Sequence, residues 1–565
     1  MPFATSTRSL GARAVPLATA AALSFTIYAT HSFSHPARND DTPVETTVLH
    51  ANAKAGSVPT VKGKILLSGA SAPLTPLGWG SNTYLTVLPD VARKTIKRPT
   101  AMSQLGATPY RDLAIHEKYG AVIDARGDLW MWGAGYDPEG EVGRSLRGKR
   151  LRKLAPGPGK LFSLSKDGRL YVVSADRAFQ DAHKKSRSWW KKLVTRDPIV
   201  DFVELHAKAL NWGEHFAGVA VGQHHLLAVT NHGRTFSLPL SPAANTHRQL
   251  GTKQTFPVAD TPKEALAQSP DLPPASDPRF ATTLTEIPAL SGIQIAEVAA
   301  SERSSFVRTT EGRVLGFGAN DYGQIGLGPT TTVSTVPTPV EISLGKAYPN
   351  GASVRCTGIT AGGQTTLFTV ESTLPGASTT LVDVLSCGNG QNGSLGSGMW
   401  SSASYAPARI KAISSLQEYS EKEGKTIPIG IYSLSMSPSP MCHAFAVLDT
   451  VRNADAKGAG EGLFGKDVLV WGGNSDYQLG TGKRSAQATP QHLASVIPHA
   501  IDTLVADIGT EEVEGSPIPV TRLQLHTGKA DAYDPMGKLI KRGVKVEETL
   551  VAGYNCSVLY SKIVS

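Results

Sequence analysis

The hydrophobic positions of this chain fall into short alternating runs that are separated by glycine-rich turns. Runs such as RVLGF from Arg313 and VLVWG from Val468 have the period and the residue types of β-strands. The tripeptides EGR, DGR and HGR follow apolar runs and are typical of hairpin turns, because glycine adopts positive φ without strain. The pattern therefore predicts an all-β chain.

One unit of strand, turn, strand and glycine-rich turn recurs along the sequence. The best copy is FVRTTEGRVLGFGANDYGQIGLG, from Phe306 to Gly328. Further copies, strong or degraded, begin at Ala121, Leu161, Leu226, Val382 and Asp467. A single unit cannot bury its own apolar faces, so neighbouring copies are expected to stack into a ring.

The glycine-rich turn is the most specific part of the unit and occurs as FGANDYGQIG, CGNGQNGSLG and WGGNSDYQLG. It resembles the repeat of the regulator of chromosome condensation family. That resemblance covers residues 74–565 and implies a seven-bladed β-propeller, with insertions near 177–210 and 240–290. Half-motifs occur near Gly80, Gly133, Val173, Ser237, Gly318, Gly388 and Gly472.

The two ends of the repeat region complement each other. The region begins with the second half of a unit, LGWGSNTYLTV from Leu77, and ends with a first half, LVAGYNCSVLYS, from Leu550 to Ser561. We expect the two halves to share one blade and to close the ring by pairing distant strands.

The N-terminal segment has the composition of a mitochondrial presequence. No Asp or Glu occurs from Met1 to Asn39, and Arg8 and Arg13 precede an apolar stretch at 14–33 whose length approaches that of a membrane span. We predict a presequence in 1–38 that includes a transmembrane helix at 14–33, followed by a linker at 39–73. A wholly cleaved signal, secretory signals included, and an unstructured N-terminus are the alternatives.

Composition and motifs argue against a catalytic centre. The four cysteines lie far apart without a CxxC pair, which argues against a zinc site and predicts buried small side chains. GEGLFGK from Gly460 has P-loop spacing, but Asp467 replaces the required Ser or Thr and a strand is expected to follow. For His224 and His225 a structural role is favoured over metal binding. We expect no enzyme activity, no catalytic residue, no metal and no cofactor.

Two basic segments are candidates for surface contacts, in a chain with a formal net charge of +9. The segment 182–198 surrounds two tryptophans with basic residues, which suits an anionic lipid surface or an acidic partner. Its candidate contact residues are Lys184, Lys185, Arg187, Trp189, Trp190, Lys191 and Lys192. The alternative is a solvated helix whose tryptophans cover a blade edge. The run 143–160 carries seven basic residues and is predicted to be a loop, which either meets phosphate or lipid headgroups or is merely solvated.

The presequence-like start and the irregular ring together resemble the fungal mitochondrial inner-membrane proteins of this repeat family. The resemblance implies a non-enzymatic role in assembly of respiratory complex III (cytochrome bc1) near insertion of the Rieske subunit. The propeller would face the intermembrane space, the segment 14–33 would anchor it in the inner membrane, and its partners would be complex III subunits or assembly intermediates rather than nucleic acid. A guanine-nucleotide exchange factor for a small GTPase and a general matrix scaffold are the alternatives.

Overall fold

The computed structural model describes residues 45–47, 60–62, 75–182, 200–208, 210–253, 277–331, 333–420, 424–450, 466–493 and 522–564. The chain forms two compact units, Met1–Gly63 and Lys64–Ser565. In the first unit, β1 (Glu45–Thr47) pairs antiparallel with β2 (Thr60–Lys62). The predicted presequence and the apolar segment 14–33 lie outside the described residues. Within the described ranges, no helix is both long and apolar enough to span a bilayer.

The second unit is built from groups of antiparallel strands, with four consecutive strands of the chain in most groups. One group contains β5 (Asp112–Ile115), β6 (Gly120–Ile123), β7 (Leu129–Trp132) and β8 (Gly143–Arg144). The next two contain β9 (Leu151–Gly157), β10 (Lys160–Ser165), β11 (Leu170–Ser174) and β12 (Val203–Ala207), then β13 (Phe216–Val221), β14 (His225–Thr230), β15 (Thr235–Pro239) and β16 (Thr283–Glu286). A short parallel pairing of β12 with β16 joins these two groups into one eight-stranded sheet.

The remaining groups follow the same order along the chain. Two of them contain β17 (Ile295–Ala300), β18 (Ser304–Thr309), β19 (Val314–Ala319) and β20 (Thr335–Glu341), then β21 (Ser353–Gly362), β22 (Thr365–Thr373), β23 (Leu381–Gly390) and β24 (Ser401–Arg409). Another contains β27 (Gly430–Met436), β28 (His443–Asp449), β29 (Lys466–Gly472) and β30 (Gln487–His492), with β31 (Gln524–Leu525) added to β29. β29 is the strand expected after GEGLFGK.

The last group combines both ends of the repeat region. It contains β32 (Thr527–Tyr533), β33 (Leu539–Ala552), β34 (Cys556–Ile563), β3 (Leu77–Ser81) and β4 (Thr95–Ala101). β34 pairs antiparallel with β3, with Leu559 opposite Leu77 and Cys556 opposite Gly80. The predicted closure by non-local strand pairing is therefore confirmed.

The connections contain the few remaining elements. They are α2 (Arg177–Ala182), the hairpin of β25 (Gln417–Ser420) and β26 (Lys425–Pro428), and the 3-10 turns η1 (Ser103–Leu105), η2 (Pro288–Leu290), η3 (Leu344–Ala347) and η4 (Lys411–Ile413).

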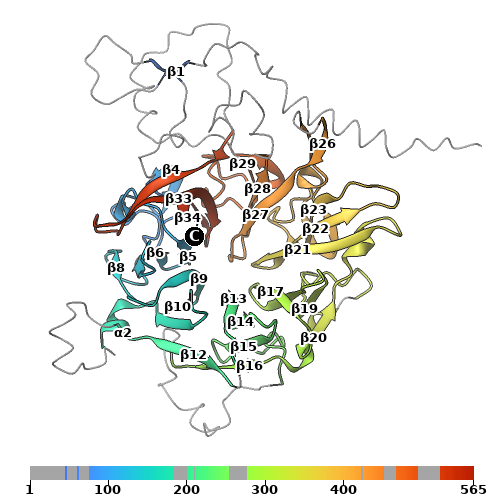
Figure 1. The fold of residues 1–565 in the computed structure, drawn as a ribbon, viewed down its shortest axis with the longest axis horizontal. Helices are drawn as coiled ribbons and strands as arrows, with labels where there is room; N and C mark the ends of the chain where they lie inside the picture. The colour runs from blue at the N-terminus through green and yellow to red at the C-terminus, as the bar shows by residue number, and fades with distance from the viewer. Residues whose placement is uncertain are drawn as a thin grey trace, which may run out of the picture. The chain divides into compact units, whose positions relative to one another are not determined.

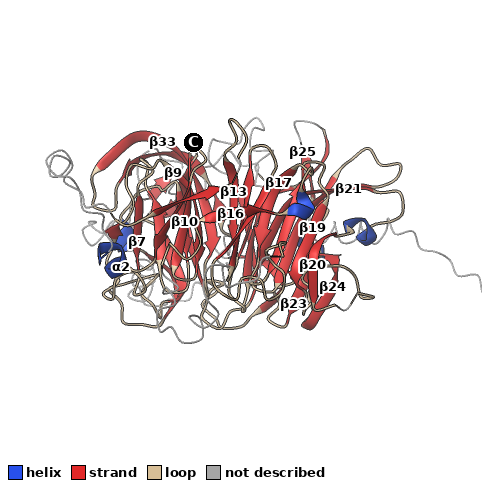
Figure 2. Cartoon of the chain, turned by 90° about the horizontal axis from the view of Figure 1, so that it is seen from below, coloured by secondary structure: helices blue, strands red, loops and turns tan. Residues whose placement is uncertain are grey.

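The groups are arranged as a ring, with one strand of each at the centre: the first strand in six groups and β33 in the last. β5, β9, β13, β17, β21, β27 and β33 each contact the next, and β33 contacts β5. Figure 1 shows later strands of the groups, such as β10, β14 and β15, following outward from this inner circle, and Figure 2 shows the strands standing side by side when the ring is seen edge-on. The second unit is an all-β propeller, as the sequence predicted.

The repeat motif acts through its asparagine and its hairpin glycine. Asn474 donates from Nδ2 to the carbonyls of Lys483 (2.6 Å) and Ser485 (2.9 Å) and accepts from the Leu479 amide (3.0 Å), which fixes the loop before β30. In the predicted EGR turn, Gly312 has a φ of 87°, which a residue with a Cβ rarely adopts. Both residue types are therefore required by the backbone rather than by a ligand.

Candidate functional site

The contact residues expected from the first basic segment fall outside the described residues. Lys184, Lys185, Arg187, Trp189, Trp190, Lys191 and Lys192 belong to residues 183–199, which separate α2 from Val200. Their contact with a membrane or a partner stays a prediction.

The second basic run, 143–160, is described and is not the loop that the sequence predicted. Leu151–Gly157 forms β9, which pairs with β10 and contacts β5 and β13 in the inner circle. The apolar side chains of Leu151 and Leu154 are buried, and this burial favours the strand despite the charged neighbours. The prediction failed because the basic residues masked the alternating apolar positions between them.

Most cations of this run already have partners within the propeller. The guanidinium of Arg144 lies 5.2 Å from the centre of the Trp130 ring, and Arg150 forms an ion pair with Asp167 at 3.2 Å. The ammonium of Lys149 lies 4.5 Å from the Phe202 ring centre. Lys160 is buried, and that burial lowers its pKa to about 8. Arg152 and Lys153 instead point into a pocket.

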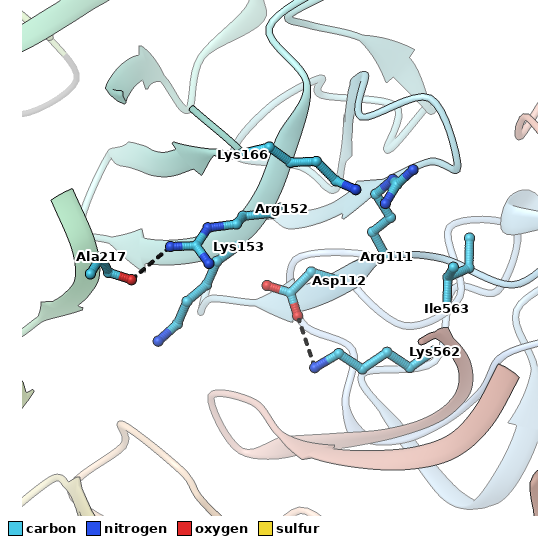
Figure 3. Close-up of a pocket in the computed structure, with 8 residues that line it drawn as sticks. All are labelled: Arg111, Asp112, Arg152, Lys153, Lys166, Ala217, Lys562 and Ile563. Atoms are coloured by element: carbon cyan, nitrogen blue, oxygen red, sulfur yellow. Dashed lines mark hydrogen bonds and ion pairs between the residues drawn. The ribbon is translucent and has the colours of Figure 1, made fainter. Parts of the chain in front are cut away.

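The pocket has a volume of about 520 Å³ and takes its lining from four parts of the ring. Its lining residues are Arg111 and Asp112 at the start of β5, Arg152 and Lys153 on β9, Lys166 after β10, Ala217 on β13, and Lys562 and Ile563 at the end of β34. In Figure 3 the ends of Lys166 and Arg111 face each other, and Arg152 extends toward Ala217. The carboxylate of Asp112 lies beside Lys562, between the two arginines. Five cationic side chains thus surround one carboxylate.

Hydrogen bonds to the main chain hold both pocket arginines. Arg111 donates to the carbonyl of Ala125 from Nε at 3.0 Å and from Nη2 at 2.6 Å. Arg152 donates from Nη2 to the carbonyl of Ala217 at 2.7 Å. Asp112 accepts the Leu154 amide at 2.7 Å, and its other oxygen lies 3.9 Å from the ammonium of Lys562.

The pocket residues also perturb one another's charge. Repulsion from the Arg111 guanidinium is the largest cause that lowers the pKa of Lys166, and burial adds to it. Burial raises the pKa of Asp112, while Lys562 and the Leu154 amide oppose that rise. Repulsion between cations of the pocket is therefore seen at Lys166.

His225, at the start of the second strand β14, has a structural role, as predicted. His225 is fully buried, and its Nε2 lies 2.9 Å from Oγ of Ser305 in the neighbouring group, whose hydroxyl donates to the Gln249 carbonyl at 2.7 Å. His443 repeats the arrangement with Ser557 (2.8 Å). Burial lowers the pKa of both histidines to about 3, so both are neutral at physiological pH.

The cysteines are all buried and free, as the sequence predicted. Burial raises the pKa of Cys356 and Cys556 to about 12, which disfavours the reactive thiolate. In the described part of the chain, no group of three or more His, Cys, Asp or Glu side chains is placed to hold a metal.

Comparison with known proteins agrees with the repeat pattern. Models of the regulator of chromosome condensation (RCC1) repeat match residues 295–324 and 311–369. Residues 295–369 thus match the regulator of chromosome condensation repeat. Protein pim1 of Schizosaccharomyces pombe is 23% identical to this repeat protein over 296 residues, which are 50% of this chain and 49% of pim1. The match thus spans about half the length of this relative.

Solved structures show the likeness of fold over most of the repeat propeller. Prp20p from Saccharomyces cerevisiae matches with a TM-score of 0.51 at 14% identity and covers 88% of this chain and 94% of its own. Human WBSCR16 matches with a TM-score of 0.52 at 15% identity and covers 88% of this chain and 100% of its own. At these identities the comparison supports the propeller fold and leaves partners open.

Sequence reasoning missed Arg111, Lys166 and Lys562, the cationic pocket residues outside the second basic run. Arg111 directly precedes a first strand, Lys166 opens a DGR turn, and Lys562 ends the closing second strand. Because adjacent strands of a blade are antiparallel, these three positions lie at the same end of the ring. Aligning the basic residues by their position within the repeat could have found them.

Proposed function

We propose that this repeat propeller is a non-enzymatic scaffold that binds other proteins. The observation that carries the proposal is an exposed apolar pair in the connection from β23 to β24, where Met399 is 67% and Trp400 is 57% exposed. Tryptophan and methionine are enriched at the centres of protein interfaces, and tryptophan often contributes most of the binding energy. Prp20p, which shares the fold, binds Gsp1p and histones.

The specific role that we propose is assembly of respiratory complex III near insertion of the Rieske subunit. The presequence-like composition of 1–38 and the resemblance of the whole sequence to fungal inner-membrane repeat proteins support this role. In this proposal the strand groups of Lys64–Ser565 are the seven blades, the segment 14–33 anchors the protein, and the propeller faces the intermembrane space.

Protease protection and crosslinking test the proposal together. We expect the tagged protein in isolated mitochondria to resist protease until the outer membrane is ruptured and to resist carbonate extraction. Crosslinking should recover complex III intermediates, and Met399→Ser with Trp400→Ser should reduce that recovery about tenfold or more. Trp212→Ser, which alters a 99% exposed tryptophan between β12 and β13, is the matched control. Protection until the inner membrane is dissolved would instead favour a matrix scaffold.

Guanine-nucleotide exchange is the second candidate, because Prp20p binds Gsp1p. An exchange factor binds its GTPase most tightly when the nucleotide is absent. A pull-down with a panel of nucleotide-free small GTPases tests this activity, and a stable complex that GTP dissolves would support it over the assembly role.

A further inference from the structure

We propose that the pocket lined by Arg111, Arg152, Lys153, Lys166 and Lys562 binds a compact polyanion that carries two phosphate groups. The proposal concerns a small ligand at one end of the ring and does not depend on the protein partner proposed above. Figure 3 shows the cationic ends that carry it.

The first argument is the imbalance of charge. Asp112 is the only acidic residue among the eight that line the pocket, and it already accepts the Leu154 amide and lies beside Lys562. Among the described residues, Lys153 and Lys166 form no ion pair, and Lys153 acts on Asp112 only through its charge. Crowded like charges destabilise a fold unless a counter-charge joins them. A bound polyanion would supply that counter-charge.

The second argument is preorganisation. Arg111 donates to the Ala125 carbonyl and Arg152 to the Ala217 carbonyl, and these bonds fix both guanidinium groups. Each guanidinium has further N–H donors that take no part in these bonds. A guanidinium matches phosphate oxygens in a two-pronged geometry, and fixing it beforehand reduces the entropy lost on binding. The two arginines lie on different sides of the pocket in Figure 3, which favours a ligand with two anionic groups.

The third argument is size and polarity. A volume of about 520 Å³ is in the range of small-molecule pockets and exceeds what a single phosphate fills. Ala217 and Ile563 are the only apolar residues of the lining, so the pocket does not suit an apolar ligand. A soluble diphosphate and the two-phosphate headgroup of cardiolipin share the required chemistry.

Titration of the full chain with inorganic pyrophosphate, measured by calorimetry at low and at physiological salt, tests the proposal. We expect saturable binding that weakens with salt and that falls about tenfold or more in the double variant Lys153→Ala with Lys166→Ala, since both side chains are exposed and their loss should spare the fold. Lys411→Ala, which alters an exposed lysine of η4 outside the pocket, should bind like the unaltered protein.

A variant that gains affinity separates recognition from simple damage. Asp112→Asn removes the one repelling carboxylate yet can still accept the Leu154 amide, so pyrophosphate should bind several-fold more tightly. Flotation with vesicles of cardiolipin or of phosphatidylserine then distinguishes a lipid ligand from a soluble one. Binding to cardiolipin that is selective and requires Lys153 and Lys166 identifies a lipid headgroup. Binding of pyrophosphate without binding to cardiolipin vesicles identifies a soluble ligand. No saturable binding to either probe, or an equal loss in Lys411→Ala, would overturn the proposal. A poly-glutamate peptide that binds where pyrophosphate does not would also overturn it, in favour of an acidic protein.

Discussion

The Nε2 atom of His443 on β28 lies 2.8 Å from the Oγ atom of Ser557 on β34, a residue 114 positions further along the chain. The Ser557 hydroxyl donates in turn to the Gln478 carbonyl at 2.7 Å. Because Ser557 has a single hydroxyl hydrogen, its oxygen must accept from the histidine, which sets the tautomer of His443. This chain of bonds ties the group of β27–β30 to the strand that closes the ring.

Ser557→Ala should destabilise the propeller by about 1–3 kcal/mol, because it leaves a buried histidine donor and a buried carbonyl without their partner. The measurement is the free energy of unfolding in urea. Ser402→Ala, at an exposed position of β24, should change it by less than about 0.5 kcal/mol. Equal effects of the two substitutions would contradict the role assigned to the bond.

The buried histidines predict a loss of stability in acid. Burial lowers the pKa of His225 and His443 to about 3 in the folded state, whereas an unfolded histidine titrates near 6.5. The unfolded chain therefore binds more protons between these values, and the stabilisation that is complete above about pH 6.5 is lost as the pH falls toward 3. His443→Gln should flatten the dependence of unfolding free energy on pH over this window, and the exposed His232→Gln should leave it steep.

Glu548 on β33 predicts the opposite dependence. Burial raises the pKa of this carboxyl to about 7, against the Glu reference of 4.5, although it accepts the His526 amide at 2.9 Å. The folded state then binds more protons, so stability falls as the pH rises from about 4.5 through 7. We expect Glu548→Gln to stabilise the protein at pH 8 by on the order of 2 kcal/mol and to have little effect at pH 4. Urea unfolding at both pH values measures the change in unfolding free energy. An equal change at pH 4 and pH 8 would contradict the raised pKa of Glu548.

Gly472 at the end of β29 should not tolerate a side chain. Its φ is 102°, and a Cβ there would lie 2.5 Å from the carbonyl oxygen of Cys442. Gly472→Ala should cost at least about 3 kcal/mol of unfolding free energy. Gly376→Ala is the matched control, because its φ of 77° imposes strain while no atom lies within 4 Å of the Cβ, and it should cost only about 1 kcal/mol. Similar losses of unfolding free energy in the two variants would show that the backbone around Gly472 can shift to make room for a Cβ.

Removal of residues 550–565 should abolish the cooperative unfolding of the propeller. The deletion takes away the end of β33 and all of β34, which lies between β33 and β3, and it removes the C-terminal members of the hydrophobic cluster that contains Trp79. Thermal unfolding followed by circular dichroism measures it. Deletion of residues 564–565 alone, which removes the exposed Val564 and leaves β34 whole, is the control and should preserve the transition. An unchanged melting curve of the longer truncation would contradict closure by β34.

The sequence by itself determined most of the strands, the hairpin turns of the repeat and the closure of the ring. These features depend on interactions within one hairpin or loop, such as the positive φ of Gly312 and the loop bonds of Asn474. Local interactions of this kind can be predicted from the residues that take part in them. Even the pairing of β34 with β3 could be predicted, because each end of the region carries half of a repeated unit.

Only the tertiary structure decided which distant side chains meet. Ser305 and Ser557 became partners of buried histidines through the stacking of neighbouring groups, and β9 became an inner strand because its leucines could be buried there. Arg111, Lys166 and Lys562 are unremarkable surface cations in sequence. They face one pocket because strand starts, hairpin turns and the chain's end meet at one end of the ring, and that convergence depends on how the whole ring packs.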